Sequence, residues 1–316
     1  MKIDTSFARA ARVLPREHSL IKIYVVGAGG TGSFAAPCLA RLGYELIRRG
    51  KTVDLTIIDP DRVEACNIPR SNFCAAEIGR FKAQTLAERI SAAWGLEIGY
   101  ANEKLIYEKH IKASGGGNRQ LTIIVGCVDN HLARREIHRA LKECEPYSST
   151  DAPSAWWIDG GNGKYSGQVL IGSTAKKDSA ANHFTTASIC RKLPAPSLVH
   201  PELLENQAIP APRETVERSS CPELVGIGEQ SLNINQRVAV EIAEMLSELL
   251  LTISLKRFVA YFDLESGTSR SLYCTMETIE KALSEAASSV KVSNSKGRGR
   301  AKRKSNGTRT EDFYAR

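Results

Sequence analysis

The sequence predicts an α/β protein with a Rossmann-like, doubly wound and mostly parallel sheet, followed by an antiparallel hairpin and a disordered basic tail. Apolar runs of strand length alternate with segments of helical periodicity. A glycine cluster joins the first apolar run to the first helix. A later run is apolar almost throughout, which is typical of a strand that helices cover on both faces.

The composition is that of a globular protein, with 316 residues and 42% hydrophobic residues. No apolar run approaches the roughly 20 residues needed to span a bilayer. Residues 1–20 lack the apolar core of a signal peptide. We therefore expect a cytoplasmic protein with no membrane partner.

The formal net charge of +8 is unevenly distributed. Residues 291–316 contain nine Lys or Arg and two acidic residues, so this segment accounts for +7. The chain before it is nearly neutral, and polycationic tails are usually solvated and disordered. Nucleic acid is expected to bind, at most, through this tail.

The first half of the chain contains strand–helix units that predict parallel pairing with right-handed crossovers. The expected elements are strand 21–27, helix 32–47, strand 53–59, helix 75–94, strand 121–129, helix 132–144 and strand 155–159.

The second half changes character. Residues 174–228 are polar and contain six prolines, and a loop of this length is usually functional or disordered. An amphipathic helix at 229–250, a hairpin at 257–274 and a short helix at 276–289 follow. The expected organisation is an N-terminal arm at 1–20, one domain at 21–290 with residues 174–228 crossing over the site, and the tail at 291–316.

A glycine-rich motif, GAGGTG, supplies Gly27, Gly29, Gly30 and Gly32 between the first strand and helix. Glycine permits a tight turn and lets a phosphate approach the backbone amides, and the helix N-terminus adds a partial positive charge. In this context the pattern indicates nucleotide binding. The alternative is a tight structural turn.

Polar side chains follow the second strand. Asp59 ends that strand, where a carboxylate can bind the ribose hydroxyls, although a turn-forming role is the alternative. Asp61, Asn67 and Arg70 come shortly afterwards, and Lys82 lies in the next helical segment. Arg70 and Lys82 are the kind of cations that a reacting triphosphate needs. Taken singly, each is more simply explained as a solvated surface cation.

Asp129 and Asn130 follow the apolar strand in the sequence VGCVDN. The carboxyl end of a parallel strand is where an open α/β sheet binds its ligands. Asp129 can therefore hold magnesium through oxygen, and Asn130 can cap the next helix. A purely capping role for Asp129 is the alternative.

Four motifs in order, GAGGTG, DPDRVEACNIPR, GRFK and CVDN, resemble the ThiF/MoeB/HesA family, whose adenylation domain ubiquitin-activating enzymes share. The resemblance extends over about residues 20–275. The chain length and basic tail are also similar to ThiF-related proteins of the plasmid-associated PRTRC cassette.

This resemblance implies adenylation, in which a carboxylate attacks the α-phosphate of ATP and releases pyrophosphate. The carboxylate is usually the C-terminal glycine of a ubiquitin-like β-grasp protein. Family members are commonly homodimers in which an N-terminal arginine reaches the neighbour's ATP, and Arg12 and Arg16 are loose matches. The implied ligands are the glycine loop for ATP, Asp59 for the ribose, Asn67, Arg70 and Lys82 for the phosphates, and Asp129 for Mg²⁺.

The chain departs from the family pattern at three places. Ser71 stands where a glutamine usually follows the phosphate-binding arginine. The two C-x-x-C pairs of a structural zinc are missing, and only single cysteines, Cys190 and Cys274, lie nearby, so no zinc is predicted. The interval from the glycine loop to Asp59 is long, which should lengthen the first helix.

Cys221, in ERSSCPELVGIG, resembles the position where ThiF-like members have a cysteine that bonds covalently to the activated partner. A thiol near a helix start can act as a nucleophile. A loop or packing role is the alternative.

Three other functions stay open. The same chemistry can act on a small molecule or a tRNA-nucleoside carboxylate. A scaffold can bind nucleotide or a ubiquitin-like protein without turnover. A nicotinamide oxidoreductase would leave Arg70, Lys82 and Asp129 without a role.

Overall fold

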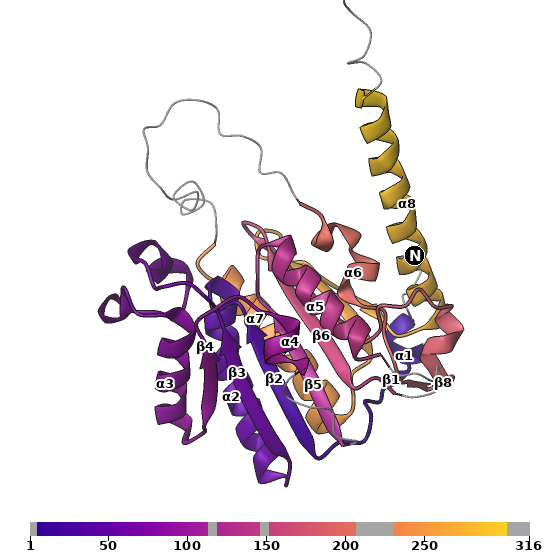
Figure 1. Ribbon diagram of the computed structural model, residues 1–316. Helices are drawn as coiled ribbons and strands as arrows, with labels where there is room; N and C mark the ends of the chain where they lie inside the picture. Colours follow the sequence, from indigo (N-terminus) through magenta and orange to yellow (C-terminus); the bar gives the residue numbers. More distant parts are fainter. Residues whose placement is uncertain (1–4, 113–118, 146–151, 207–230, 302–316) are drawn as a thin grey trace, which may run out of the picture.

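The computed structural model describes residues 5–112, 119–145, 152–206 and 231–301. Its main sheet has eight strands in the order β11-β10-β7-β6-β5-β2-β3-β4, with helices on both faces (Figure 1). The predicted Rossmann-like α/β class is confirmed. The strands are β2 (Leu20–Val26), β3 (Thr52–Ile58), β4 (Ile98–Ala101), β5 (Gln120–Gly126), β6 (Ala155–Asn162), β7 (Ser166–Gly172), β10 (Arg257–Asp263) and β11 (Ser269–Tyr273).

The five strands β4, β3, β2, β5 and β6 are parallel, and their register aligns their carboxyl ends. Val26 at the end of β2 pairs with Ile58 of β3 and with Gly126 of β5. Gly126 in turn pairs with Asp159 of β6. The loops that leave β2, β3 and β5 therefore start side by side.

The remaining strands β7, β10 and β11 extend the sheet in antiparallel fashion. The predicted hairpin at 257–274 is confirmed as β10 and β11. Its turn contains Gly267, which has a positive φ of 69°. The main sheet thus has a parallel half and an antiparallel half that meet between β6 and β7.

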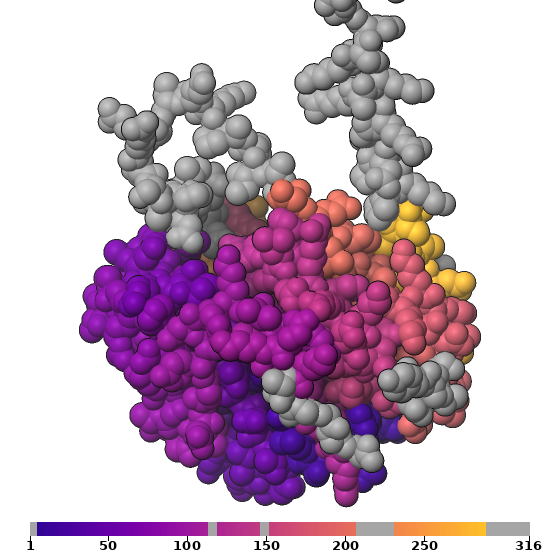
Figure 2. All heavy atoms as spheres, viewed as in Figure 1, coloured from indigo at the N-terminus to yellow at the C-terminus, as the bar shows by residue number. Residues whose placement is uncertain are grey.

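Helices cover opposite faces of this sheet, and alternate residues of β2 show why. Ile21, Ile23 and Val25 pack into the hydrophobic core on one face, whereas Tyr24 and Val26 join a second core on the other face. Helix α5 belongs to the second face, which Figure 2 shows in space-filling form. The main helices are α2 (Gly30–Arg48), α3 (Lys82–Trp94) and α7 (Ile234–Ser247) on the first face, and α4 (Tyr107–His110) and α5 (His131–Glu143) on the second.

A small three-stranded sheet ties the N-terminal arm to the crossover segment. Strand β1 (Arg12–Val13) pairs in parallel with β9 (Ile189–Cys190), which pairs with β8 (Phe184–Thr186). The described part of the arm is therefore part of the folded structure. The other short elements are α1 (Ser6–Arg9), η1 (Ala65–Arg70), η2 (Ala75–Glu77), η4 (Ala180–His183), α6 (Pro196–Val199) and η5 (Pro201–Leu204).

The prediction of a single helix at 75–94 is wrong. The chain forms only a short 3₁₀ turn, η2, and α3 begins at Lys82. Gly79 lies between them with φ +85°, a conformation that is incompatible with a continuing right-handed helix. The result places Lys82 at the first position of α3.

The last helix is longer than expected. Helix α8 (Met276–Ala301) continues past residue 289, so the expected tail start at 291 lies within its backbone. Residues 290–301 contain no proline, the residue that ends a helix most strongly. Helix α7 ends in a π-helical turn, η6 (Glu248–Thr252). Within the described ranges, every helix is too short or too polar to cross a membrane.

Candidate functional site

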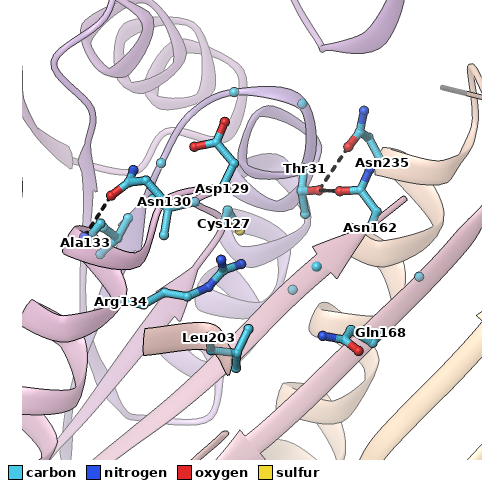
Figure 3. Close-up of a pocket in the computed structure, with 18 of the residues that line it drawn as sticks. Thr31, Cys127, Asp129, Asn130, Ala133, Arg134, Asn162, Gln168, Leu203 and Asn235 are labelled. Carbon is cyan, nitrogen blue, oxygen red and sulfur yellow. Dashed lines mark hydrogen bonds between the residues drawn. The ribbon is translucent and has the colours of Figure 1, made fainter. Parts of the chain in front are cut away.

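A cavity of about 1340 Å³ opens where the loops after β2, β3 and β5 come together. Its other walls come from β6, β7, α7 and β10 (Figure 3). The predicted site residues that line it are Gly27, Gly29, Gly30, Asp59, Asp61, Asn67, Arg70, Lys82, Asp129 and Asn130. The structure therefore brings together motifs that are far apart in the sequence, from Gly27 to Asn130.

The glycine loop forms a cradle whose turn is too tight for a side chain at two of its positions. Gly27 has φ +91°, and a Cβ atom there would lie 2.5 Å from the carbonyl oxygen of Cys127. Gly32 does not line the cavity, but a Cβ atom there would lie 1.8 Å from the carbonyl oxygen of Gly27. In the part of the chain that the structure describes, no side-chain hydrogen bond caps the start of α2, and the unpaired N–H groups of a helix start can bind an anion.

Asp59 lies beneath this loop and is only 5% exposed. Its Oδ2 atom accepts a hydrogen bond from the Ala28 amide at 2.6 Å, and its Oδ1 atom accepts one from the Asp61 amide at 2.8 Å. Burial raises the pKa of Asp59, while these amides and Lys82 oppose the shift. The carboxylate is thus fixed in orientation beside the predicted ribose site.

Two cations approach the cavity from different elements. Lys82 is buried at the start of α3, and its Nζ atom lies 3.3 Å from Oδ2 of the mostly exposed Asp61. Arg70 ends η1 and lines the cavity. Asn67 lines it as well, but its Oδ1 atom accepts the Glu64 amide at 3.0 Å and so caps η1. Asn67 therefore shapes the segment that presents Arg70.

Asp129 and Asn130 follow β5 at the rim. Asp129 is exposed and points toward the glycine loop in Figure 3. Asn130 caps α5, since its Oδ1 atom accepts the Ala133 amide at 2.9 Å. The capping role expected for this segment thus belongs to Asn130, which leaves the Asp129 carboxylate facing the cavity.

A family model described as "ThiF family" matches residues 16–223, about two thirds of the chain. The chain belongs to the ThiF family. This result confirms the resemblance drawn from the four motifs. The matched region includes every predicted site residue but ends before α7.

A curated relative, "Ubiquitin-like modifier-activating enzyme 5" from Oryza sativa subsp. japonica, is 29% identical over 131 residues. The match covers 38% of this chain and 29% of that protein. A solved structure of PaaA has a TM-score of 0.52 at 16% identity, over 80% of this chain and 64% of PaaA. An E. coli MccB structure with AMPCPP and MccA has a TM-score of 0.49 at 13% identity, over the same shares. The likeness to PaaA shows that the two proteins share a fold.

The residues that line the cavity of this ThiF-family chain could hold a nucleoside triphosphate with Mg²⁺. The glycine cradle presents amides, and Arg70 and Lys82 supply positive charge. Mg²⁺ is usually bound by one or two carboxylates together with substrate phosphates. One exposed carboxylate, Asp129, meets that need, even though the described residues contain no group of three His, Cys, Asp or Glu arranged for a metal.

Two side-chain groups of the cavity were not predicted. The Thr31 hydroxyl lies 3.1 Å from Oδ1 of Asn235, with Oδ1 of Asn162 at 3.5 Å as a second acceptor. Arg134 lines the cavity and pairs with Asp159. These residues lie on α2, α5, β6 and α7, so no local motif in the sequence indicates that they meet.

The cysteines that the structure describes add no further site. Cys221 lies outside the described residues, and its role stays a prediction. Cys190 and Cys274 are buried, and burial raises the pKa of the Cys190 thiol to about 12. This thiol donates a hydrogen bond to the Lys192 carbonyl at 3.1 Å. Both features favour a protonated packing thiol at Cys190, and the absence of zinc remains an expectation.

Proposed function

We propose that this chain is an ATP-dependent adenylating enzyme. The observation that supports it is the convergence of the glycine cradle, Asp59, Arg70, Lys82 and Asp129 on one cavity. The cavity also exceeds the roughly 300–1,000 Å³ of common small-ligand sites, so it has room for a second reactant beside the nucleotide. The proposed reaction is attack of a carboxylate on the α-phosphate of ATP.

Each residue has a distinct task in this reaction. Amides of the glycine loop and the N-terminus of α2 bind phosphate oxygens. Asp59 accepts hydrogen bonds from the ribose. The charge that moves onto the leaving pyrophosphate is stabilised by Asn67, Arg70 and Lys82. Lys82 then exchanges part of its interaction with Asp61 for phosphate oxygen. Asp129 would hold Mg²⁺, which when bound neutralises phosphate charge.

The partner that we propose is a ubiquitin-like β-grasp protein with a C-terminal glycine. The name of the rice relative, an enzyme that activates a ubiquitin-like modifier, supports this choice. A homodimer with Arg12 or Arg16 reaching the neighbouring site is also proposed. Arg12 is exposed on β1 and is compatible with such a contact. The oligomeric state in solution tests this last point.

ATP–pyrophosphate exchange tests the proposed function. Exchange that requires a candidate ubiquitin-like protein, and that disappears when its terminal carboxylate is converted to an amide, would support adenylation of a protein. Binding of ATP without exchange against any carboxylate would favour a scaffold. Preference for NAD over ATP in equilibrium binding would favour a redox enzyme instead.

The first prediction concerns Asp129. We expect Asp129→Ala to lower exchange by about 10²–10³-fold, the usual loss when a group that stabilises transition-state charge is removed. Mg²⁺ should strengthen ATP binding by the wild type but not by this variant. Because Asp129 is exposed, the melting temperature of the Asp129→Ala variant should equal that of the wild type. Glu143→Ala, an exposed carboxylate at the far end of α5, is the matched control. Normal exchange by Asp129→Ala would remove this residue from the mechanism.

A further inference from the structure

Arg134 is a buried cation on the cavity wall that the nucleotide motifs do not use. It lies in the first turn of α5 and is only 8% exposed. The N-terminus of a helix has a partial positive charge, so this position is unfavourable for a guanidinium. Burial adds a further cost that only a partner can offset. The chain therefore keeps Arg134 where helix position and desolvation both oppose it.

The partner is Asp159 on β6, which is fully buried. The Nε atom of Arg134 lies 3.2 Å from both carboxylate oxygens of Asp159. The neighbouring strand provides the space, because a Cβ atom at Gly126 would lie 2.7 Å from Oδ2 of Asp159. Asp159 thus holds the guanidinium by one edge and sets its orientation.

The other edge of the guanidinium faces the cavity (Figure 3). Arg has five N–H donors in a rigid planar fork, and the Asp159 contact uses only Nε. Within the described ranges, no hydrogen bond engages Nη1 or Nη2 of Arg134. Neither atom is among the fully buried polar atoms that lack a partner, so both remain accessible to solvent. Two Nη groups in this arrangement match the two oxygens of a carboxylate.

This wall is distinct from the one that serves the phosphates. Arg70 and Lys82 belong to η1 and α3, which follow β3. Arg134 lies on the side of the cavity where Leu203 of η5 and Gln168 of β7 project (Figure 3). Here the antiparallel half of the sheet begins, and a chain entering from this side would meet Arg134 on its way to the nucleotide.

We propose that Arg134, oriented by Asp159, positions the carboxylate that attacks ATP. This inference rests on the proposed function and names a residue for its second reactant. One carboxylate oxygen forms the new bond to the α-phosphorus, and the bond from that phosphorus to the pyrophosphate oxygen breaks. The other oxygen stays against the Nη groups of Arg134. Arg134 keeps its proton throughout, and the negative charge leaves with pyrophosphate.

The direction of the reaction explains why this position suits an arginine whose positive charge is balanced by a neighbouring carboxylate. The substrate is an anion and binds the guanidinium by a charge-assisted pair. After transfer, the same oxygen is an uncharged acyl oxygen, so the charge-assisted pair is reduced to a hydrogen bond from the guanidinium, which still contributes about tenfold or more to affinity. Asp159 prevents the site from holding product as tightly as an unpaired arginine would. A structural ion pair is the competing explanation, and the two differ in which ligands they affect.

Binding of two nucleotides tests the proposal. The first probe is AMP, and the second is 5′-O-(N-glycylsulfamoyl)adenosine, a stable mimic of a glycyl adenylate that adds the acyl group. For Arg134→Met we expect affinity for the glycyl probe to fall about tenfold or more, while affinity for AMP and ATP stays within twofold. Arg139→Met, on the exposed side of the same helix, should change neither.

Removing one member of a buried ion pair can impair folding, so the double variant Arg134→Met/Asp159→Asn removes both charges. It should show the same selective loss, with melting temperature as the check on folding. Equal losses for AMP and the glycyl probe, or no loss for either, would overturn the role of Arg134. A wild type that binds neither ATP nor AMP would overturn the proposed function itself, and the Arg134 inference with it.

Discussion

At the scale of single residues, Asp59 shows how the site fixes a charge before any ligand arrives. The Ala28 and Asp61 amides each donate to one of its carboxylate oxygens, so the side chain cannot rotate. Its two amide donors come from the glycine loop and from the segment leading to Arg70. Asp59 therefore couples the position of the cradle to the position of a cation.

The titration of Asp59 leads to a prediction about stability. Because burial raises its pKa, the folded chain holds this proton more tightly than the unfolded chain does. Its contribution to the free energy of unfolding is complete below the ordinary pKa of 3.8 and is lost as pH rises through the folded value. Asp59→Asn removes this titration. The stability advantage of the wild type over Asp59→Asn should shrink with rising pH in urea unfolding experiments, and an advantage that grows would contradict the assignment.

The residues that the sequence could predict are those whose chemistry follows from local spacing. Asp59 and Asp129 each follow an apolar strand, and that position alone indicated the ligand edge of the sheet. Arg134 has no such signal. Its partner, Asp159, lies on the next strand, and only the β5–β6 pairing reveals the contact. Lys82 was predicted as a site residue although the helix around it was placed wrongly.

At the scale of elements, α7 holds the nucleotide half of the cavity together. Its Asn235 is buried, receives the Thr31 hydroxyl at 3.1 Å, and donates through Nδ2 to the Arg70 carbonyl at 3.0 Å. A Cβ atom at Gly30 would come within 2.7 Å of this side chain. Helix α7 thereby joins the start of α2 to the segment that presents Arg70, although it lies outside the residues matched by the family model.

Asn235→Ala tests this bridging role. Loss of both hydrogen bonds in a buried place should lower the free energy of unfolding by about 1–3 kcal/mol. If α7 also positions Arg70 and the glycine loop, affinity for ATP should fall about tenfold, which corresponds to roughly 1.4 kcal/mol. Calorimetric titration with ATP and urea unfolding measure the two effects. Gln236→Ala, exposed on the same helix, is the control. Unchanged ATP affinity in a folded Asn235→Ala variant would limit this side chain to packing.

Elements with a strong periodic signal were predicted well, and short or polar ones were not. Helices α2 and α5 and strands β2, β3 and β5 lie within a few residues of the expected ranges. Strand β4 is short and half exposed, and β7 contains two glycines; neither is among the strands that the sequence predicts. Glycine in each segment lowers its strand preference, so pairing with neighbours in the sheet contributes more to forming these two strands.

At the scale of the whole molecule, the cavity joins two kinds of sheet. The parallel half presents the glycine loop, Asp59 and Asp129 through its aligned strand ends. The antiparallel half supplies the opposite wall through β7, β10 and β11. Contiguous motifs made the first half predictable from the sequence. The second wall assembles from strands separated by residues 173–256, so the sequence alone could not show which of its side chains face the nucleotide.

The charge distribution of the whole chain supports a final prediction. Residues 291–316 hold +7 of the net charge of +8, so a variant that ends at Ala301 loses five basic and two acidic residues. Binding to a polyanion depends on the number of cations that contact it, and its affinity falls steeply with salt. The shortened variant should therefore elute from a heparin column at lower salt than the full chain. Its affinity for ATP should stay within about twofold, because the shortened variant keeps every residue that lines the cavity. Elution of both proteins at the same salt would instead place a polyanion-binding surface on the folded domain.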